Sequence, residues 1–120
     1  METFGYERGN GMKIYFGVCG EKYRVLSPLF YGGIKIPAGF EFDGVTVKAP
    51  FTFLFSNKDL RQGIRASCFH DWMCNHKDRY RREYATNVLV EIWREDGLEA
   101  WKAWFVRWSV NLYQRLGGWE

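Results

Sequence analysis

The sequence has no long apolar run, few cysteines and no concentrated charge of one sign. No apolar stretch approaches the roughly 20 residues of a membrane-spanning helix. Three cysteines is an odd number, which excludes a complete disulfide framework. The net charge of +3 comes from dispersed residues, whereas nucleic-acid-binding proteins usually gather basic residues on one face. We therefore expect no membrane span and no disulfide scaffold, and the charge disfavours nucleic acid as a partner.

The first residues also lack the pattern of a secretion signal. Residues 1–7 contain neither a basic block nor an apolar one. With the odd cysteine count, this favours a protein made and kept in a reducing cytoplasm. Assembly into a particle after synthesis would leave the same signature.

Aromatic residues, in contrast, are abundant, at 19% of the chain with six tryptophans. Large rings bury much area per residue, so they predict a compact core or an adhesive surface. A chain of 120 residues is long enough for one such core. We expect a single domain over residues 1–120, with a β-rich half (1–55) and a helical half (56–120).

The β-rich half shows alternating patterns separated by glycine turns. Residues 13–18 and 22–26 flank a Gly20-Glu21 turn, and residues 34–36 follow a turn at 31–33. Pro37 then stands at a strand end, where its missing N–H does little harm. This order predicts a small antiparallel β-meander.

The helical half predicts three α-helices packed on the meander, which makes the fold class α+β. The first runs from about residue 57 to 75, after Ser56 and Asp59, which have the spacing of a capping box. The second spans about 79–95 and ends at Gly97. The third carries an aromatic stripe closed by glycines 117–118.

That aromatic stripe has two interpretations. Helical spacing places five large apolar side chains on one side of the third helix: Trp101, Trp104, Phe105, Trp108 and Leu112. Core packing is the favoured interpretation, because most such stripes face a core. A partner-binding face is the alternative.

The segment 68–76, CFHDWMCNH, holds both histidines and two of the three cysteines. Cys68, His70, Cys74 and His76 are zinc-ligand types, but their spacing lacks the usual paired forms. At 100° per residue His70 and Cys74 share a helix face, while the other two point away. A four-ligand site within one helix is therefore disfavoured, and two ligands completed from elsewhere stay open.

Two catalytic interpretations of this segment are also weak. Metal-dependent phosphohydrolases with a His-Asp doublet need another histidine upstream, and His70 is the first in the chain. A Cys74–His70 nucleophile pair needs a third orienting group, and neighbours on one helix rarely achieve that geometry. The plain alternative makes His70 a buried core residue and lets Asp71 anchor a neighbouring backbone or cap.

A wider pattern resembles a family of short phage and prophage proteins, domain of unknown function 1353. The residues that carry it are Ile36-Pro37-Ala38-Gly39-Phe40, then Asp43, then His70-Asp71-Trp72, in order over about residues 30–117. The resemblance implies that Asp43, His70 and Asp71 occupy the family's polar motif positions.

The chain departs from the family pattern at several positions. Thr46 stands where a serine is usual, and Lys48 replaces a proline, with Pro50 the nearest substitute. The family's later aspartate falls near Thr86, so that carboxylate is absent. A metal or acid–base site built from these positions would lack one ligand, which weighs against catalysis.

Three functions follow as hypotheses. The favoured one is a non-enzymatic phage protein, either a virion component of tail or neck or an accessory interaction module. It would be made in the host cytoplasm and bind other virion proteins or a host protein, and Asp43, His70 and Asp71 would tie the meander to the first helix. In the second, a metal-assisted hydrolase of the host cell wall, these residues are catalytic groups around a divalent metal; otherwise no cofactor is favoured. The third is an inhibitor of host defence.

Overall fold

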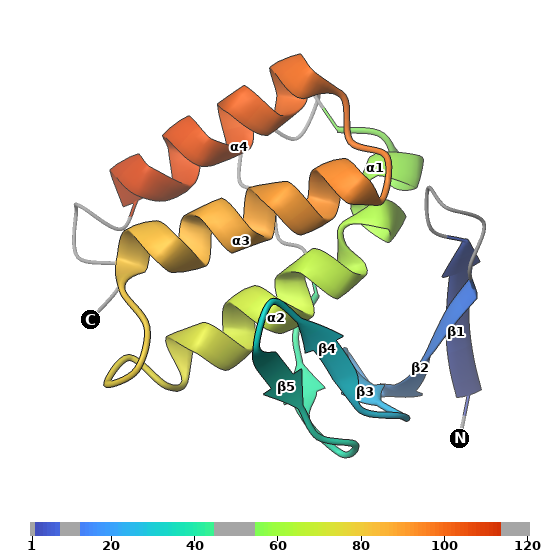
Figure 1. Cartoon of the computed structure of the whole chain (residues 1–120). Coiled ribbons are helices and arrows are strands. Elements are labelled where there is room, and N and C mark those ends of the chain that lie inside the picture. Colours follow the sequence, from blue (N-terminus) through green and yellow to red (C-terminus); the bar gives the residue numbers. More distant parts are fainter. Residues whose placement is uncertain (1, 8–12, 45–54, 114–120) are drawn as a thin grey trace.

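The β-rich half forms two antiparallel sheets in a computed structural model that describes residues 2–7, 13–44 and 55–113 (Figure 1). The larger sheet has the order β1-β2-β3-β6. The smaller is the hairpin β4-β5. Their bounds are Glu2–Glu7 (β1), Lys13–Cys19 (β2), Lys22–Val25 (β3), Leu29–Tyr31 (β4), Ile34–Ile36 (β5) and Glu41–Phe42 (β6).

The three predicted strands are confirmed, but they do not form one meander. β4 and β5 pair only with each other, as an excursion between β3 and β6, and β6 returns to pair with β3. The strands β1, β4 and β6 were not predicted. In β5 the expected alternation holds, since Ile34 and Ile36 are buried and Lys35 is exposed.

The helical half contains four helices rather than three. They are α1 (Asn57–Gln62), α2 (Ile64–Cys74), α3 (Arg82–Glu95) and α4 (Ala100–Tyr113). The first predicted helix is two helices because the chain changes direction at Gly63, which ends α1 and begins α2. The predicted capping box at Ser56 is confirmed, with Asp59 as its acidic partner. Within the described ranges, no helix is long and apolar enough to span a membrane.

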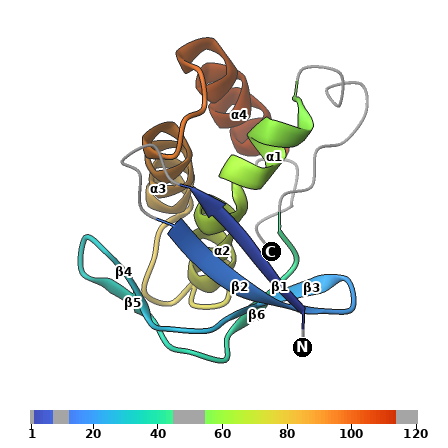
Figure 2. The same cartoon turned by 90° about the vertical axis from the view of Figure 1, so that its right-hand side faces the viewer.

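The helices stack in layers above the sheets. α3 lies between α2 and α4, and α2 lies against the sheet half (Figures 1 and 2). The core is filled from both halves, by residues such as Phe16, Ile36, Phe69, Met73 and Ile92. α4 is therefore the layer farthest from the sheets.

A buried ion pair fixes the α2–α3 packing. Arg65 of α2 donates to both carboxylate oxygens of Asp96, at 3.0 and 3.2 Å. The two residues are 4% and 0% exposed. Asp96 is the C-cap residue of α3, directly after Glu95, so this pair positions the turn from α3 into α4.

Gly97 makes that turn and gives a first prediction. Its φ is +119°, and an added Cβ would lie 2.5 Å from the side-chain nitrogen of Gln62. Because both the backbone and the space oppose a side chain, Gly97→Ala should lower the free energy of unfolding by more than about 1 kcal/mol in urea titration. Gly33→Ala is the matched control, since its φ is +87° with nothing within 4 Å. Equal losses in the two variants would show that Gln62 contributes nothing.

Candidate functional site

The structure brings together two of the three polar residues singled out in the sequence. Asp43 follows β6, and its backbone N–H donates to Asp71 Oδ2 of α2 at 3.3 Å. Asp71 therefore anchors a neighbouring backbone segment to the helix, as the plain interpretation predicts. His70 lies beside Cys74, one turn further along α2, with its Nδ1 3.7 Å from the sulfur. His70 thus contacts its own helix, whereas Asp71 contacts the segment that follows β6.

The His70–Cys74 contact joins two neutral groups. Burial lowers the pKa of His70 to about 4. Burial, and next the Asp71 carboxylate, raises the pKa of Cys74 to about 11. At neutral pH the imidazole is uncharged and the thiol keeps its proton. A nucleophilic cysteine needs the thiolate, so this pair is arranged for packing rather than for attack on a substrate.

Burial also shifts the pKa of the Asp71 carboxyl group, in the direction opposite to that of His70. Burial raises its pKa to about 6; Asp43 adds to the rise, while the Asp43 N–H and Lys22 lower it. Asp71 is therefore a charged group held at the junction between sheet and helix at neutral pH. Its ionised form is disfavoured by the site.

The other members of segment 68–76 point to separate places. Cys68 is buried. The ring of His76 lies on that of Trp72, with centroids 4.1 Å apart, and its Nδ1 is 2.7 Å from the Trp72 carbonyl oxygen. Over the described ranges, no three side chains of His, Cys, Asp or Glu converge as metal ligands.

Thr86, at the position of the family's later aspartate, is buried in α3. Its hydroxyl donates to the Arg82 carbonyl oxygen at 3.1 Å. It is 1% exposed, so a carboxylate here would need a buried partner. Thr46, Lys48 and Pro50, with glycines 117–118, lie outside the described residues.

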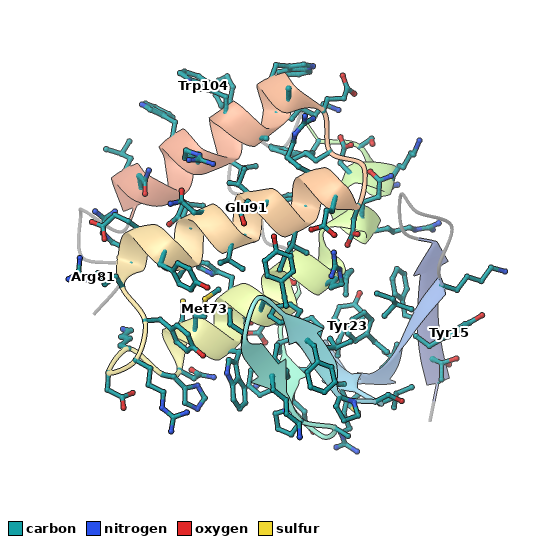
Figure 3. All side chains as sticks on the ribbon, viewed as in Figure 1. Tyr15, Tyr23, Met73, Arg81, Glu91 and Trp104 are labelled. Carbon is teal, nitrogen blue, oxygen red and sulfur yellow. The ribbon has the colours of Figure 1, made fainter. Side chains whose placement is uncertain are left out.

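The aromatic stripe of α4 is exposed, so the favoured prediction of core packing is wrong for most of it. Trp101 is 51% exposed, Trp104 62% and Trp108 46%. α4 instead packs on α3 through smaller residues, and Ala103 and Val106 are both 5% exposed. We call this stripe, in which Phe105 is half-buried and the others are exposed, the aromatic face: Trp101, Trp104, Phe105, Trp108 and Leu112. Figure 3 shows Trp104 projecting from α4 away from the rest of the domain.

Ring contacts order part of the aromatic face. Phe105 meets Trp104 edge to face, with centroids 5.6 Å apart, and meets Trp108 in the same way at 6.2 Å. Edge-to-face pairs are a favourable aromatic geometry. The three rings therefore form a pre-arranged platform on the outer layer.

A shallow groove of about 720 Å³, largely open to solvent, lies beside the aromatic face, between α3, α4 and β4. Small apolar residues line it: Val90, Ala100 and Ala103. Trp104 and Tyr31 add aromatic surface, and charged residues complete the lining: Glu91, Arg94, Glu95 and Arg107. Sequence reasoning missed the groove because its residues come from three elements. The only local signal was the i, i+3 spacing of Glu91 and Arg94 on α3.

The fold and these sites define a small α+β domain with a polar junction between sheet and α2 and an exposed aromatic face on its outer helix. A family model described as "Protein of unknown function (DUF1353)" matches residues 22–110. The chain belongs to this family, which confirms the resemblance seen in the sequence.

One curated relative is the "Uncharacterized protein y4jT" of Sinorhizobium fredii (strain NBRC 101917 / NGR234). It is 28% identical over 83 residues, which cover 68% of this chain and 24% of the relative. The chain thus spans about a quarter of the length of that relative. No solved structure matches the chain.

Proposed function

We propose that this protein is a non-enzymatic phage interaction component, either part of the virion at the tail or neck or an accessory factor. It is made in the host cytoplasm and contacts a partner protein through the aromatic face. The observation that carries the proposal is the exposure of three tryptophans on one helix whose opposite side is already packed on α3.

Exposed tryptophans of this kind are a good anchor for a protein partner. Contiguous apolar patches on soluble domains commonly mark interaction sites. Tryptophan is enriched among the residues that contribute most to binding, because it buries a large rigid area with little loss of rotamer freedom. The platform of Trp104, Phe105 and Trp108 is already ordered by its ring contacts, which reduces the entropy lost on binding.

The polar junction supports the same proposal from the other side of the domain. Asp71 holds the Asp43 backbone, and His70 packs on Cys74 as a neutral ring. Each of these groups has a structural contact. A metal-assisted hydrolase, in contrast, has no set of three ligands among the described residues.

Photo-crosslinking tests the proposal. A benzoyl-phenylalanine replaces Trp104 in the full chain during phage production, and mass spectrometry identifies the crosslinked protein. We expect crosslinks to one virion or host protein. The matched control replaces Phe30, an exposed aromatic on β4 that is 67% exposed, and should not give them.

Binding to the identified partner, once purified, gives the quantitative result. Trp104→Ser with Trp108→Ser should weaken binding at least about thirtyfold in calorimetry, the effect of losing a dominant anchor. Phe30→Ser should leave it unchanged. The proposal is wrong if position 104 crosslinks no protein, or if the tryptophan variants bind the crosslinked partner as the wild type does.

A further inference from the structure

The acidic and the basic side chains of the α3–α4 groove differ in their hydrogen-bond partners. The Glu91 carboxylate accepts from the Tyr31 hydroxyl at 3.0 Å, and burial together with this bond raises the pKa of Tyr31 to about 12, so the donor is retained. The Glu95 carboxylate accepts from Arg65 at 3.2 Å. Both carboxylates of the groove therefore already have a donor within the domain.

The two guanidinium groups of the groove are bonded differently. Arg94 donates to the Leu98 carbonyl oxygen at 3.0 Å, and Arg107 donates to the amide oxygen of Asn87 at 2.9 Å. Among the described residues, neither has a carboxylate within ion-pair distance. Each guanidinium carries five N–H donors, so both can also receive a carboxylate from another molecule.

From this arrangement we infer that the partner contributes an acidic amphipathic helix, which lies in the groove against Trp104 and places carboxylates on Arg94 and Arg107. The inference rests on the proposed function and adds the chemistry of the bound segment. Apolar side chains of that helix contact Val90, Ala103 and the Trp104 ring. The groove provides what helix recognition requires, an apolar floor with charged residues at its edge.

Charge complementarity favours an acidic helix over a second copy of the chain as the occupant of the groove. α4 carries Lys102 and Arg107 and no acidic residue between Ala100 and Tyr113. Lys102 is already paired with Asp59 and Glu99, and a second copy would bring its own Arg94 and Arg107 to the groove together with Glu91 and Glu95, so it adds no net acidic charge there. A self-association through this face is therefore the poorer fit.

The same groove is also a poor fit for polyphosphate or an anionic membrane. Glu91 and Glu95 line it beside the two arginines, so a continuous row of phosphates would meet two carboxylates. A helix can place carboxylates only at the arginines and neutral or basic residues beside the glutamates. The spacing of alternating charges thus favours a polypeptide.

Designed peptides test the inference. Three helical peptides share one leucine stripe, and their flanking positions carry glutamate, glutamine or lysine. Binding to the full chain is followed by tryptophan fluorescence at low and high salt. We expect the glutamate peptide to bind about tenfold more tightly than the glutamine peptide at low salt, and added salt to remove that preference.

Arginine variants test whether the preference for the glutamate peptide comes from Arg94 and Arg107. Arg107→Gln and Arg94→Gln should each remove several-fold of the glutamate preference and leave the glutamine peptide unaffected. Arg24→Gln makes the same charge change on β3, away from the groove, and should change neither. Equal affinity for the three peptides, no binding of any, or full preference in Arg107→Gln would overturn the inference.

Three further measurements test whether something other than an acidic helix occupies the groove. Binding of phosphatidylglycerol vesicles or oligothymidylate in place of the glutamate peptide, lost in Trp104→Ser, overturns the inference in favour of a membrane or nucleic acid. A dimer in sedimentation equilibrium that Trp104→Ser dissociates overturns it in favour of a second copy. A position-104 crosslink to a basic or neutral segment overturns this inference alone and leaves the proposed function standing.

Discussion

Arg65→Met is expected to lower the free energy of unfolding by about 3–5 kcal/mol, the largest loss that we expect from a single substitution in this chain. Arg65 donates twice to Asp96, and neither side chain reaches solvent to more than a few per cent. Methionine fills a similar volume but leaves the Asp96 carboxylate buried without its guanidinium. The cost is therefore that of burying a carboxylate without the guanidinium that neutralises it. Urea titration at pH 7 measures it.

A surface pair of the same chemistry is the matched control. Arg24 and Glu41 form an ion pair at 2.5 Å, but their side chains are 38% and 40% exposed. Solvent screens such pairs, so Arg24→Met should cost no more than about 1 kcal/mol. Adding Asp96→Leu to Arg65→Met should recover much of the loss, because an apolar pair replaces a buried ionic one. If Arg65→Met costs no more than Arg24→Met, the buried pair does not hold α2 and α3 together.

The local features of the fold were predictable from the sequence because their causes are local. The capping box at Ser56 and the glycine turns of the β-rich half depend on residues within a few positions of each other. The break at Gly63 was missed, since a glycine within an apolar pattern is often tolerated in a helix. The Arg65–Asp96 pair joins residues 31 positions apart, and no local pattern indicates such a contact.

The prediction that the aromatic stripe of α4 faces the core was wrong for a physical reason. The helix has two apolar stripes, one of large aromatic residues and one that contains Ala103 and Val106. Periodicity identifies both stripes but does not say which one is buried. The smaller residues let α4 approach α3 closely, and the tryptophans are left outside.

The polar junction was predicted in part. The family resemblance assigned Asp43, His70 and Asp71 to polar motif positions, and in the structure the Asp43 N–H donates to the Asp71 carboxylate. His70 has its contact one turn further along α2, with the sulfur of Cys74. The charge states of the two neighbours depend on burial, which the sequence does not give.

Those charge states predict opposite pH dependences for His70 and Asp71. The pKa of His70 falls from 6.5 to about 4 on folding, so between these values the unfolded chain binds the proton and stability falls as the pH falls. The pKa of Asp71 rises from 3.8 to about 6, so in that window the folded chain binds the proton and stability rises as the pH falls. Between about pH 4 and 6 the two contributions therefore oppose each other.

Single variants should separate the pH dependence of stability that comes from Asp71 from the one that comes from His70. In Asp71→Asn the amide oxygen still accepts from the Asp43 N–H, and only the buried charge is lost. This variant should be about 2 kcal/mol more stable than wild type at pH 7, a rounded-down value for a rise of about 2 pKa units. Its advantage should shrink as the pH falls from 7 to 4, because Asp71 then takes up its proton in the folded state while the unfolded chain stays largely ionised down to its pKa of 3.8. In His70→Gln stability should instead rise relative to wild type on acidification below pH 6.5.

Differences between variants at each pH give the cleanest comparison, because the other titrating groups cancel in a double-mutant cycle. Urea titrations from pH 4 to 7 on wild type, both single variants and the double variant provide the data. We expect the difference from wild type to grow with rising pH for Asp71→Asn and with falling pH for His70→Gln. Curves parallel to wild type would mean that neither group changes its pKa on folding. A cycle that deviates strongly from additivity would mean instead that the His70 ring and the Asp71 carboxylate interact directly, as one catalytic or metal-binding pair requires.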